Sequence, residues 1–321
     1  MDITTLILFI LGFVILIKGA DLLVDGASSI AKKMKISAIV IGLTIVSFGT
    51  SAPEFVVNLI ASLNGSTDLS LGNVLGSNIA NVLLVLGVTA TVYPLVTKAN
   101  TVWKEIPFAL LGSILLGVML NDMVIEGAQK SGLTRIDGIV LLAFFIIFMY
   151  YTYGIAHVQD DEISHDDIPS YSYPKSILYI ILGLLGLIFG GQWLVDGAVS
   201  IANSFGVSEA VIGLTIVAIG TSLPELVTSI VAAYKKQTDI AIGNIVGSNI
   251  FNIFWILGFS SLVAPIPYSP EQQSLSVFTS IFSVSLLFVI MFIGQKFVIQ
   301  RWQGILMICI YFAYLGYLTI W

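Results

Sequence analysis

Apolar residues occur along this chain in blocks long enough to cross a membrane as helices, which takes about 20 residues each. Short turns rich in glycine, proline or charged residues separate the blocks. The pattern predicts ten membrane-spanning helices, at about 3–31, 36–64, 69–93, 104–121, 135–156, 175–203, 207–234, 239–265, 272–295 and 302–320. The expected fold class is therefore an all-α integral membrane protein.

One connection is long and hydrophilic, at residues 157–174. Its charges are acidic and include Asp160, Asp161, Glu162, Asp166 and Asp167. Because it lacks the glycine and the ligand spacing of an EF-hand, we interpret it as a solvated linker, with a regulatory Ca²⁺ site as the alternative.

Composition narrows the function classes. Of the 321 residues 57% are hydrophobic and only 10% are charged, at a mean hydropathy of +1.00, whereas soluble domains carry about a quarter charged residues. The net charge of −6 and the absence of any long Lys/Arg cluster argue against a nucleic-acid partner. The single cysteine, Cys309, excludes intrachain disulfides and cysteine-based zinc sites.

The chain is an internal duplication. Residues 19–95 align with 190–266 without a gap, and 37 of the 77 pairs are identical. The domains predicted from this repeat are residues 1–156, with its motif at 41–81, the linker 157–174, and residues 175–321, with its motif at 212–252. Five helices per repeat is an odd number, so the second copy is expected to be inverted in the membrane.

The distribution of positive charge predicts the orientation. Odd-numbered connections hold ten Lys and Arg, whereas even-numbered ones hold two, Lys130 and Arg135. The ten are Lys32, Lys33, Lys35, Lys98, Lys104, Lys175, Lys235, Lys236, Lys296 and Arg301. Odd loops and the linker are therefore expected in the cytoplasm, and both termini outside the cell. We therefore expect a multi-pass protein of the plasma membrane.

The second helix of each repeat contains a polar motif, GTSAPE at 49–54 and GTSLPE at 220–225. Pro53 and Pro224 each remove a helical hydrogen bond, so broken helices are expected there. Thr50 and Glu54 share a helix face, as do Ser77 and Asn81 on the next helix. Such oxygen ligands select hard cations, Ca²⁺ and Na⁺.

Charge also favours a cation as substrate. No Lys or Arg lies in either motif helix to compensate Glu54 or Glu225, and an uncompensated membrane carboxylate is costly. Two glutamates supply a charge that one Ca²⁺ or about two Na⁺ would neutralise.

Other polar residues have simpler interpretations. Interhelical hydrogen bonds alone would explain the asparagines of the third and eighth helices, Asn73, Asn78, Asn244 and Asn249. Pairing with Lys18 three residues earlier would explain Asp21, and Asp25 and Asp196 need only reach the membrane surface. The pairs Gly72/Gly76 and Gly243/Gly247 are typical of helix packing.

Both motif pairs, GTSAPE with GNVLGSNIAN and GTSLPE with GNIVGSNIFN, resemble the two α-repeats of the Ca²⁺:cation antiporter superfamily, in particular its prokaryotic Na⁺/Ca²⁺ exchanger branch. The resemblance covers almost the whole chain. It implies a core formed by the second, third, seventh and eighth helices, across which the first and sixth helices slide to alternate access. It also implies a transporter and no enzyme, with transported Ca²⁺ and Na⁺ and no cofactor.

The resemblance implies a set of ion ligands by motif position. They are Thr50, Ser51, Glu54, Ser77, Asn81, Thr221, Ser222, Glu225, Ser248 and Asn252, with the backbone carbonyls of Ser47 and Ala218 for Na⁺. Relatives that depend on K⁺ carry Asp where this chain has Asn252, so K⁺ co-transport is disfavoured. Exchange of Ca²⁺ for H⁺ through Glu54 and Glu225 stays open as an alternative.

A cation channel is the alternative from another class, and it would conduct without a counter-ion. Inverted repeats and broken helices favour the antiporter. The expected partners are Ca²⁺, Na⁺, H⁺ in the alternative mechanism, and the lipid bilayer around a functional monomer.

Overall fold

The computed structural model describes residues 3–65, 67–125, 127–156, 169–204 and 218–320. Seven of its helical segments are long and apolar enough to cross a membrane, or eight when a bent pair counts as one span, among these described residues. The protein is thus a mostly helical, multi-pass membrane protein. The seven are α1 (Ile3–Met34), α5 to α6 (69–92), η3 with α7 (101–119), α9 (Arg135–Ala156), α10 (Tyr173–Ser204), α14 to α15 (238–263) and α16 (Pro270–Ile290).

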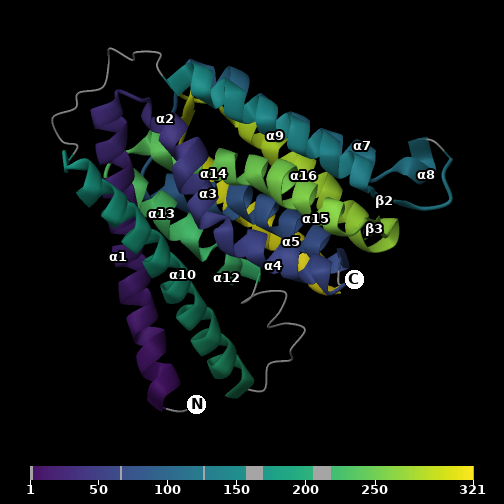
Figure 1. Ribbon diagram of the computed structural model, residues 1–321, viewed down its shortest axis with the longest axis horizontal. Coiled ribbons are helices and arrows are strands. Elements are labelled where there is room, and N and C mark those ends of the chain that lie inside the picture. The colour runs from purple at the N-terminus through teal and green to yellow at the C-terminus, as the bar shows by residue number, and fades with distance from the viewer. Residues whose placement is uncertain (1–2, 66, 126, 157–168, 205–217, 321) are drawn as a thin grey trace.

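The two longest helices, α1 and α10, form a crossed pair at one end of the molecule (Figure 1). Glycines bring their backbones into contact: a Cβ atom on Gly19 would lie 2.8 Å from the carbonyl oxygen of Gly183, and one on Gly190 would lie 2.7 Å from the amide nitrogen of Leu16. Small residues at this spacing are the usual device by which membrane helices approach closely.

The bent pair is the predicted broken helix of the first repeat. It consists of α2 (Ala38–Ile41), π-helix η1 (Gly42–Val46), α3 (Ser47–Thr50) and α4 (Ala52–Leu63). The two halves meet at 48°. Ser51 stands between them, and Pro53 lies in the first turn of α4, where a proline's missing N–H is tolerated.

The second repeat has the same break. Here α12 (Ala218–Thr221) and α13 (Leu223–Tyr234) meet at Ser222, and Pro224 begins the second half. The earlier part of this predicted helix, 207–217, lies outside the described residues. The broken helix at the first motif is therefore confirmed, and at the second motif the described residues show an interruption at Ser222.

The third helix of each repeat runs through the centre of the molecule. One comprises α5 (Thr67–Ile79), π-helix η2 (Ala80–Leu86) and α6 (Gly87–Val92), and the other α14 (Thr238–Ile250), π-helix η6 (Phe251–Leu257) and α15 (Gly258–Val263). Their side chains are almost all buried, whereas α1, α9 and α10 expose apolar side chains along most of their length. The central pair is thus screened from lipid by the other helices.

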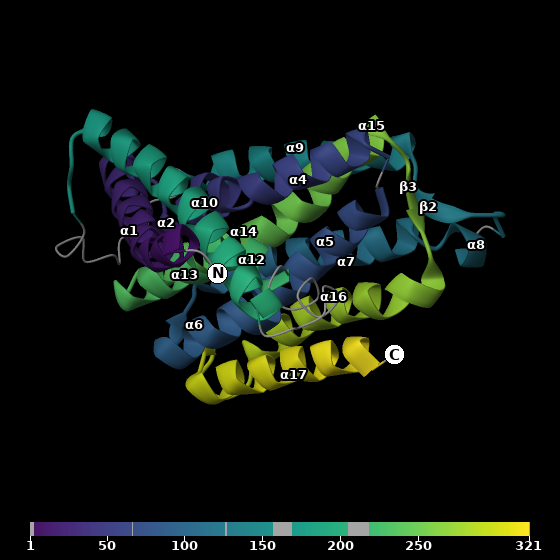
Figure 2. The ribbon, with the colours of Figure 1, turned by 90° about the horizontal axis from the view of Figure 1, so that it is seen from below.

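Two small antiparallel sheets join the repeats at the ends of helices. Strand β1 (Leu95–Val96) pairs with β4 (Val298–Ile299), and β2 (Ser131–Leu133) pairs with β3 (Ile266–Tyr268). Figure 2 shows β2 and β3 beside the short helix α8 (Asp122–Ile125) at the right, with the last helix, α17 (Arg301–Ile320), along the bottom of the view. Neither sheet was predicted from the hydropathy pattern.

The predicted helix boundaries agree with the described ones to within a few residues, with α16 as the main exception. It ends at Ile290, five residues before the predicted end at 295, because the chain then turns through Gly294 at φ +79° to reach β4. The predicted acidic linker lies outside the described residues over 157–168.

Candidate cation site

The two motif glutamates occupy equivalent places in the fold. Glu54 lies in the first turn of α4 and Glu225 in the first turn of α13, each directly after a helix break. Both side chains are buried, at 2% and 1% exposed. The positive end of a helix dipole stabilises a carboxylate at this position. The dipole therefore offsets part of the free-energy cost of burying each carboxylate.

Hydrogen bonds from the first repeat reach across to the second. Ser51 Oγ donates to Glu225 Oε1 at 3.2 Å, and Thr50 Oγ1 donates to Asn244 Oδ1 at 3.0 Å. Asn244 in turn donates from Nδ2 to Ser229 Oγ at 3.1 Å. The two breaks and the eighth predicted helix therefore meet in one polar cluster at the interface of the repeats.

Close helix packing makes this meeting possible. A Cβ atom on Gly243 would lie 3.1 Å from the Cα atom of Gly42, and one on Gly247 would clash with Ser47 Oγ. Ser47 Oγ also lies 3.0 Å from the carbonyl oxygen of Asn244. The packing role predicted for Gly243 and Gly247 is confirmed, and it brings α14 against the broken helix. Gly72 and Gly76, for which the same role was predicted, have no such neighbour within 4 Å among the described residues.

Several buried oxygens in the cluster have no hydrogen-bond partner among the described residues. Six of them come from predicted ligand residues: Glu54 Oε2, Asn81 Oδ1, Ser222 Oγ, Glu225 Oε2, Ser248 Oγ and Asn252 Oδ1. Asn58 Oδ1 on α4 and Thr228 Oγ1 on α13, which were not predicted as ligands, are unpaired as well. Buried polar atoms are normally paired, because an unpaired one costs about 1–3 kcal/mol. Carboxylate, hydroxyl and amide oxygens are the donor types of a hard-cation site.

Four asparagines form a reciprocal network between the two central helices. Asn78 Nδ2 donates to the carbonyl oxygen of Asn249, and Asn249 Nδ2 donates to that of Asn78, at 3.4 and 3.3 Å. Their side-chain oxygens then accept from Asn252 and Asn81, at 3.0 and 3.1 Å. Because a backbone carbonyl only accepts, each bond fixes the orientation of the next amide.

The network has a direct consequence for the predicted ligands. Asn81 and Asn252 use their NH₂ groups on Asn249 and Asn78, so their Oδ1 atoms are the two that stay unpaired. The interhelical role considered for Asn78, Asn244 and Asn249 is confirmed. These bonds also orient the neighbouring amides, which was not predicted from the sequence.

Basic groups take no part in the cluster. The ion pairs found within the described ranges join Lys98 to Asp239 and Lys235 to Asp21 and Asp25, and none reaches Glu54 or Glu225. The glutamates interact electrostatically with each other. Two buried carboxylates without a basic partner attract cations and repel anions.

The remaining predicted ligands lie on the same elements. Ser77 is buried on α5 and lies 3.4 Å from Asn73 Oδ1, and Thr221 ends α12. The Ser47 carbonyl accepts the Ser51 N–H at 2.9 Å and faces Thr50 Oγ1 at 3.3 Å. Ala218 begins α12. Ser47 thus has a carbonyl beside the cluster, although its hydrogen bonds already use part of that oxygen's capacity.

A third buried acid among the described residues was not predicted from the sequence. Glu105, 1% exposed, ends the π-helix η3 (Thr101–Glu105) and accepts a hydrogen bond from the Tyr151 hydroxyl of α9. Glu105 follows Lys104 at the start of an apolar block, and in the sequence such a position is typical of an exposed charge at the membrane surface. Since its partner belongs to a different pair of helices from the motif cluster, Glu105 lies outside the candidate site.

A small apolar cavity of about 80 Å³ adjoins the first break at Ser51. Aromatic side chains line most of it, namely Phe48, Phe55, Phe251 and Trp255. A cation would lose its hydration there without gaining oxygen ligands, so the unpaired oxygens, and not this cavity, mark the place for an ion.

Comparison with known proteins agrees with this donor set. The family model described as sodium/calcium exchanger protein matches residues 4–154 and 175–320. The chain is 42% identical to the putative antiporter CaxA of Alkalimonas amylolytica, over 81% of each chain. It is 31% identical to the sodium/calcium exchanger MaX1 of Methanosarcina acetivorans, over 96% of this chain and 97% of that one.

A solved structure has the same fold. The sodium-calcium exchanger NCX_Mj, soaked with 2.5 mM Na⁺ and 0.1 mM Ca²⁺, superposes with a TM-score of 0.82 at 35% identity, covering 98% of this chain and 99% of that one.

Proposed function

Because the chain belongs to the sodium/calcium exchanger protein family, we propose that it exchanges Na⁺ for Ca²⁺ across the membrane through one site shared by both ions. The family consists of transporters, and the two ions are substrates of this one. The observation that carries the proposal is a set of six unpaired buried oxygens on predicted ligand residues. Two of these oxygens belong to carboxylates that have no basic partner in the described structure.

The donor set supports a shared site. Glu54 and Glu225 supply two negative charges, which one Ca²⁺ or about two Na⁺ would balance. The hydroxyls of Thr50, Ser51, Ser77, Thr221, Ser222 and Ser248, the amide oxygens of Asn81 and Asn252, and the carbonyls of Ser47 and Ala218 complete the proposed ligands. Since both ions use the same oxygens, occupancy by one excludes the other.

Asn78 and Asn249 act in this proposal as positioning residues. They hold the NH₂ groups of Asn252 and Asn81, so that the amide oxygens face the ion before it arrives. An amide free to rotate would present its NH₂ group to a cation half of the time. Preorganised ligands bind more tightly because less order has to be created on binding.

We further propose ten membrane-spanning helices in two inverted five-helix units, residues 1–156 and 175–321, joined by the linker 157–174. The gap-free repeat of 19–95 at 190–266 supports this division. The strand pairing supports the sidedness: β1 and β4 both lie in odd-numbered connections, and β2 and β3 both lie in even-numbered ones.

With the positive charges on the inside, the odd connections face the cytoplasm and both termini the exterior of a plasma membrane. Each chain contains both halves of the site, so a monomer suffices for function.

The test is uptake of ⁴⁵Ca²⁺ into proteoliposomes with the Na⁺, K⁺ and pH gradients varied independently. An outward Na⁺ gradient should drive uptake, and collapse of that gradient should stop it. Uptake that ignores Na⁺ and follows the pH gradient would establish Ca²⁺/H⁺ exchange instead. Ca²⁺ flux that needs no counter-ion at all would identify a channel.

A further inference from the structure

The two long helices, α1 and α10, are repeat counterparts but contact the core differently. α1 packs along α13, whereas α10 has no comparable contact with α4, the counterpart of α13; all four helices are described in full. One of two equivalent interfaces is therefore closed and the other is not. Such an asymmetry between equivalent halves is expected when a protein with two near-equal states occupies one of them.

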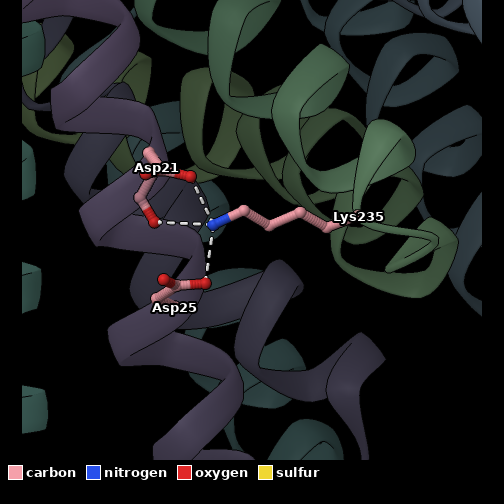
Figure 3. A network of polar contacts seen from close by, with 3 residues as sticks. All are labelled: Asp21, Asp25 and Lys235. Carbon is pink, nitrogen blue, oxygen red and sulfur yellow. Dashed lines mark hydrogen bonds and ion pairs between the residues drawn. The ribbon is translucent and has the colours of Figure 1, made fainter. Parts of the chain in front are cut away.

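An ion pair joins the closed interface (Figure 3). Lys235, in the loop directly after α13, places its Nζ atom 2.5 Å from Asp21 Oδ1 and 2.6 Å from Asp25 Oδ1 of α1. The same Nζ atom donates to the backbone carbonyl of Asp21 at 3.2 Å. Asp21 and Asp25 are four residues apart and share one helix face, so a single lysine fixes one turn of α1 to the end of α13.

The three contacts use the full capacity of the lysine. An ammonium has three N–H donors, and here they face three oxygens of one helix turn. The side chains of Lys235 and Asp25 are 26% and 20% exposed, and that of Asp21 is 39% exposed. The Lys235–Asp25 contact is therefore screened by solvent less than a surface pair is. Asp21 was predicted to pair with Lys18, but it pairs with Lys235 of the other repeat.

Lys235 keeps its charge over the physiological pH range. Partial burial lowers its pKa, but hydrogen bonds and charges from Asp21 and Asp25 outweigh burial and raise the pKa above that of an ordinary lysine. For a cation with a raised pKa, the stabilisation is fully present below its ordinary value and disappears only as pH rises through the raised value. The pair is therefore intact at neutral pH.

No equivalent ion pair can form in the other repeat. Asn64 occupies the place of Lys235, and Gln192 and Asp196 occupy those of Asp21 and Asp25. Asp196 already accepts a hydrogen bond from Gln192 Nε2 of its own helix at 2.9 Å. If α10 closed on α4, that interface would lack a lysine to join the two helices.

We propose that Lys235 is a one-sided latch that stabilises the state with α1 on α13 relative to its mirror state with α10 on α4. This inference rests on the proposed antiport by alternating access. In the proposed orientation Lys235 is cytoplasmic, so the latch keeps the cytoplasmic side closed and the resting protein open to the outside. Each transport cycle has to break the three contacts of Lys235 and form them again.

The test compares Lys235→Gln with Lys236→Gln, which removes the same charge from the next residue without touching the network in Figure 3. Hydrogen–deuterium exchange is measured in lipid nanodiscs over α1 residues 18–31 and the α13 segment 226–237. Loss of the latch should raise exchange in both segments by roughly 3- to 10-fold, the population shift expected for a partly buried pair with two partners. Lys236→Gln should leave both unchanged.

Two further variants make the result independent of the folding of Lys235→Gln. Asn64→Lys places a lysine opposite Asp196 and should shift the equilibrium the other way, lowering exchange on α10 and α4. Adding Lys235→Gln to Asp21→Asn/Asp25→Asn should have no further effect, because contacts already broken do not add.

Equal exchange in Lys235→Gln and Lys236→Gln, or an Asn64→Lys variant that behaves as wild type, would overturn the latch. Neither result bears on the antiport itself, which stands or falls with Na⁺-driven ⁴⁵Ca²⁺ uptake by the wild-type protein. If that uptake failed while exchange responded as described, the ion pair would remain a conformational latch of a protein with a different cargo.

Discussion

At the scale of single residues, the site is defined by which oxygens remain unpaired. Serine, asparagine and glutamate are common inside helical membrane proteins, where they bond to neighbouring helices. Here the residues around the site bond to one another in a way that leaves one oxygen each on Asn81 and Asn252 without a partner among the described residues. Function therefore depends on orientation as well as on residue type.

Replacing either site carboxylate should abolish Ca²⁺ transport. Glu54→Gln or Glu225→Gln removes one of two charges from a buried site, where such an interaction is worth several kcal/mol, so uptake should fall by roughly 100-fold or more. Glutamine is nearly isosteric, so the variants should elute as monodisperse protein. Glu271→Gln, at the exposed start of α16, is the control. Normal Ca²⁺ exchange in either site variant would mean that the carboxylates are structural.

Removing a positioning amide should weaken Ca²⁺ binding more than turnover. Asn78→Ala deprives Asn252 of the acceptor that orients it; a hydrogen bond is worth about 1 kcal/mol net, so the Ca²⁺ concentration for half-maximal uptake should rise roughly 5-fold. Asn121→Ala removes an amide that bonds to Gly117 at the end of α7 and serves as the control. Equal half-saturation in the two variants would contradict a positioning role.

Because the Asn252 amide does not titrate, it should not make exchange depend on pH, whereas an aspartate at this position should. In Asn252→Asp a carboxyl oxygen takes the place of the NH₂ group that now donates to Asn78 Oδ1. That oxygen can donate to Asn78 Oδ1 only while it carries a proton. The variant should retain Na⁺-driven uptake but lose it progressively as pH rises, compared with wild type at each pH. Parallel pH profiles would show that Asn78 does not restrict this position.

Sequence reasoning located the ligand residues because the motif occurs twice at matching positions. It could not locate their partners. That Asn78 bonds to Asn249, or that Asp21 bonds to Lys235, depends on which helix faces meet, and these residues are far apart in the chain. Glu105 was missed for the same reason, since only the fold shows that Tyr151 covers it.

At the scale of elements, the helices followed from apolar block length and the breaks from proline. The strands could not be anticipated, because β1 and β4 are two residues each and have no periodicity to detect. The sequence shows that α1 and α10 are rich in glycine, but it does not show which glycines lie where the two helices touch. The structure shows which glycines are required: Gly190 lies against the backbone of α1, whereas its neighbour Gly191 has ordinary contact distance to Leu16.

This difference gives a matched pair of variants. In Gly190→Ala the new methyl group would lie 2.7 Å from the backbone nitrogen of Leu16, so the helices must separate; in Gly191→Ala the nearest atom is 3.8 Å away. Overpacking costs about 1–3 kcal/mol, so Gly190→Ala should lower the midpoint of thermal unfolding in detergent by several degrees, and Gly191→Ala should not. Equal midpoints would show that α1 and α10 are not held by backbone contact.

At the scale of the whole molecule, the charge of the site determines the stoichiometry that is possible. Two carboxylates without a third at Asn252 balance Ca²⁺ or Na⁺ and leave no charge for an additional monovalent ion. With the membrane potential clamped, a K⁺ gradient should therefore neither drive nor inhibit ⁴⁵Ca²⁺ uptake by the wild-type protein. Strong K⁺ dependence under that clamp would require a further acidic ligand, for which Glu105 would be the first residue to replace.

The strand pairing has a consequence for how such a protein could originate. Each sheet takes one strand from the end of a repeat's third predicted helix and the other from the entry to the opposite repeat's fifth, and the exchange is reciprocal. A single unduplicated repeat has both strand types but, in this arrangement, pairs neither within itself. An ancestor with one repeat would have completed its sheets only by assembling with a second, oppositely inserted copy, so gene fusion would have preserved an existing dimer and not created a new interface.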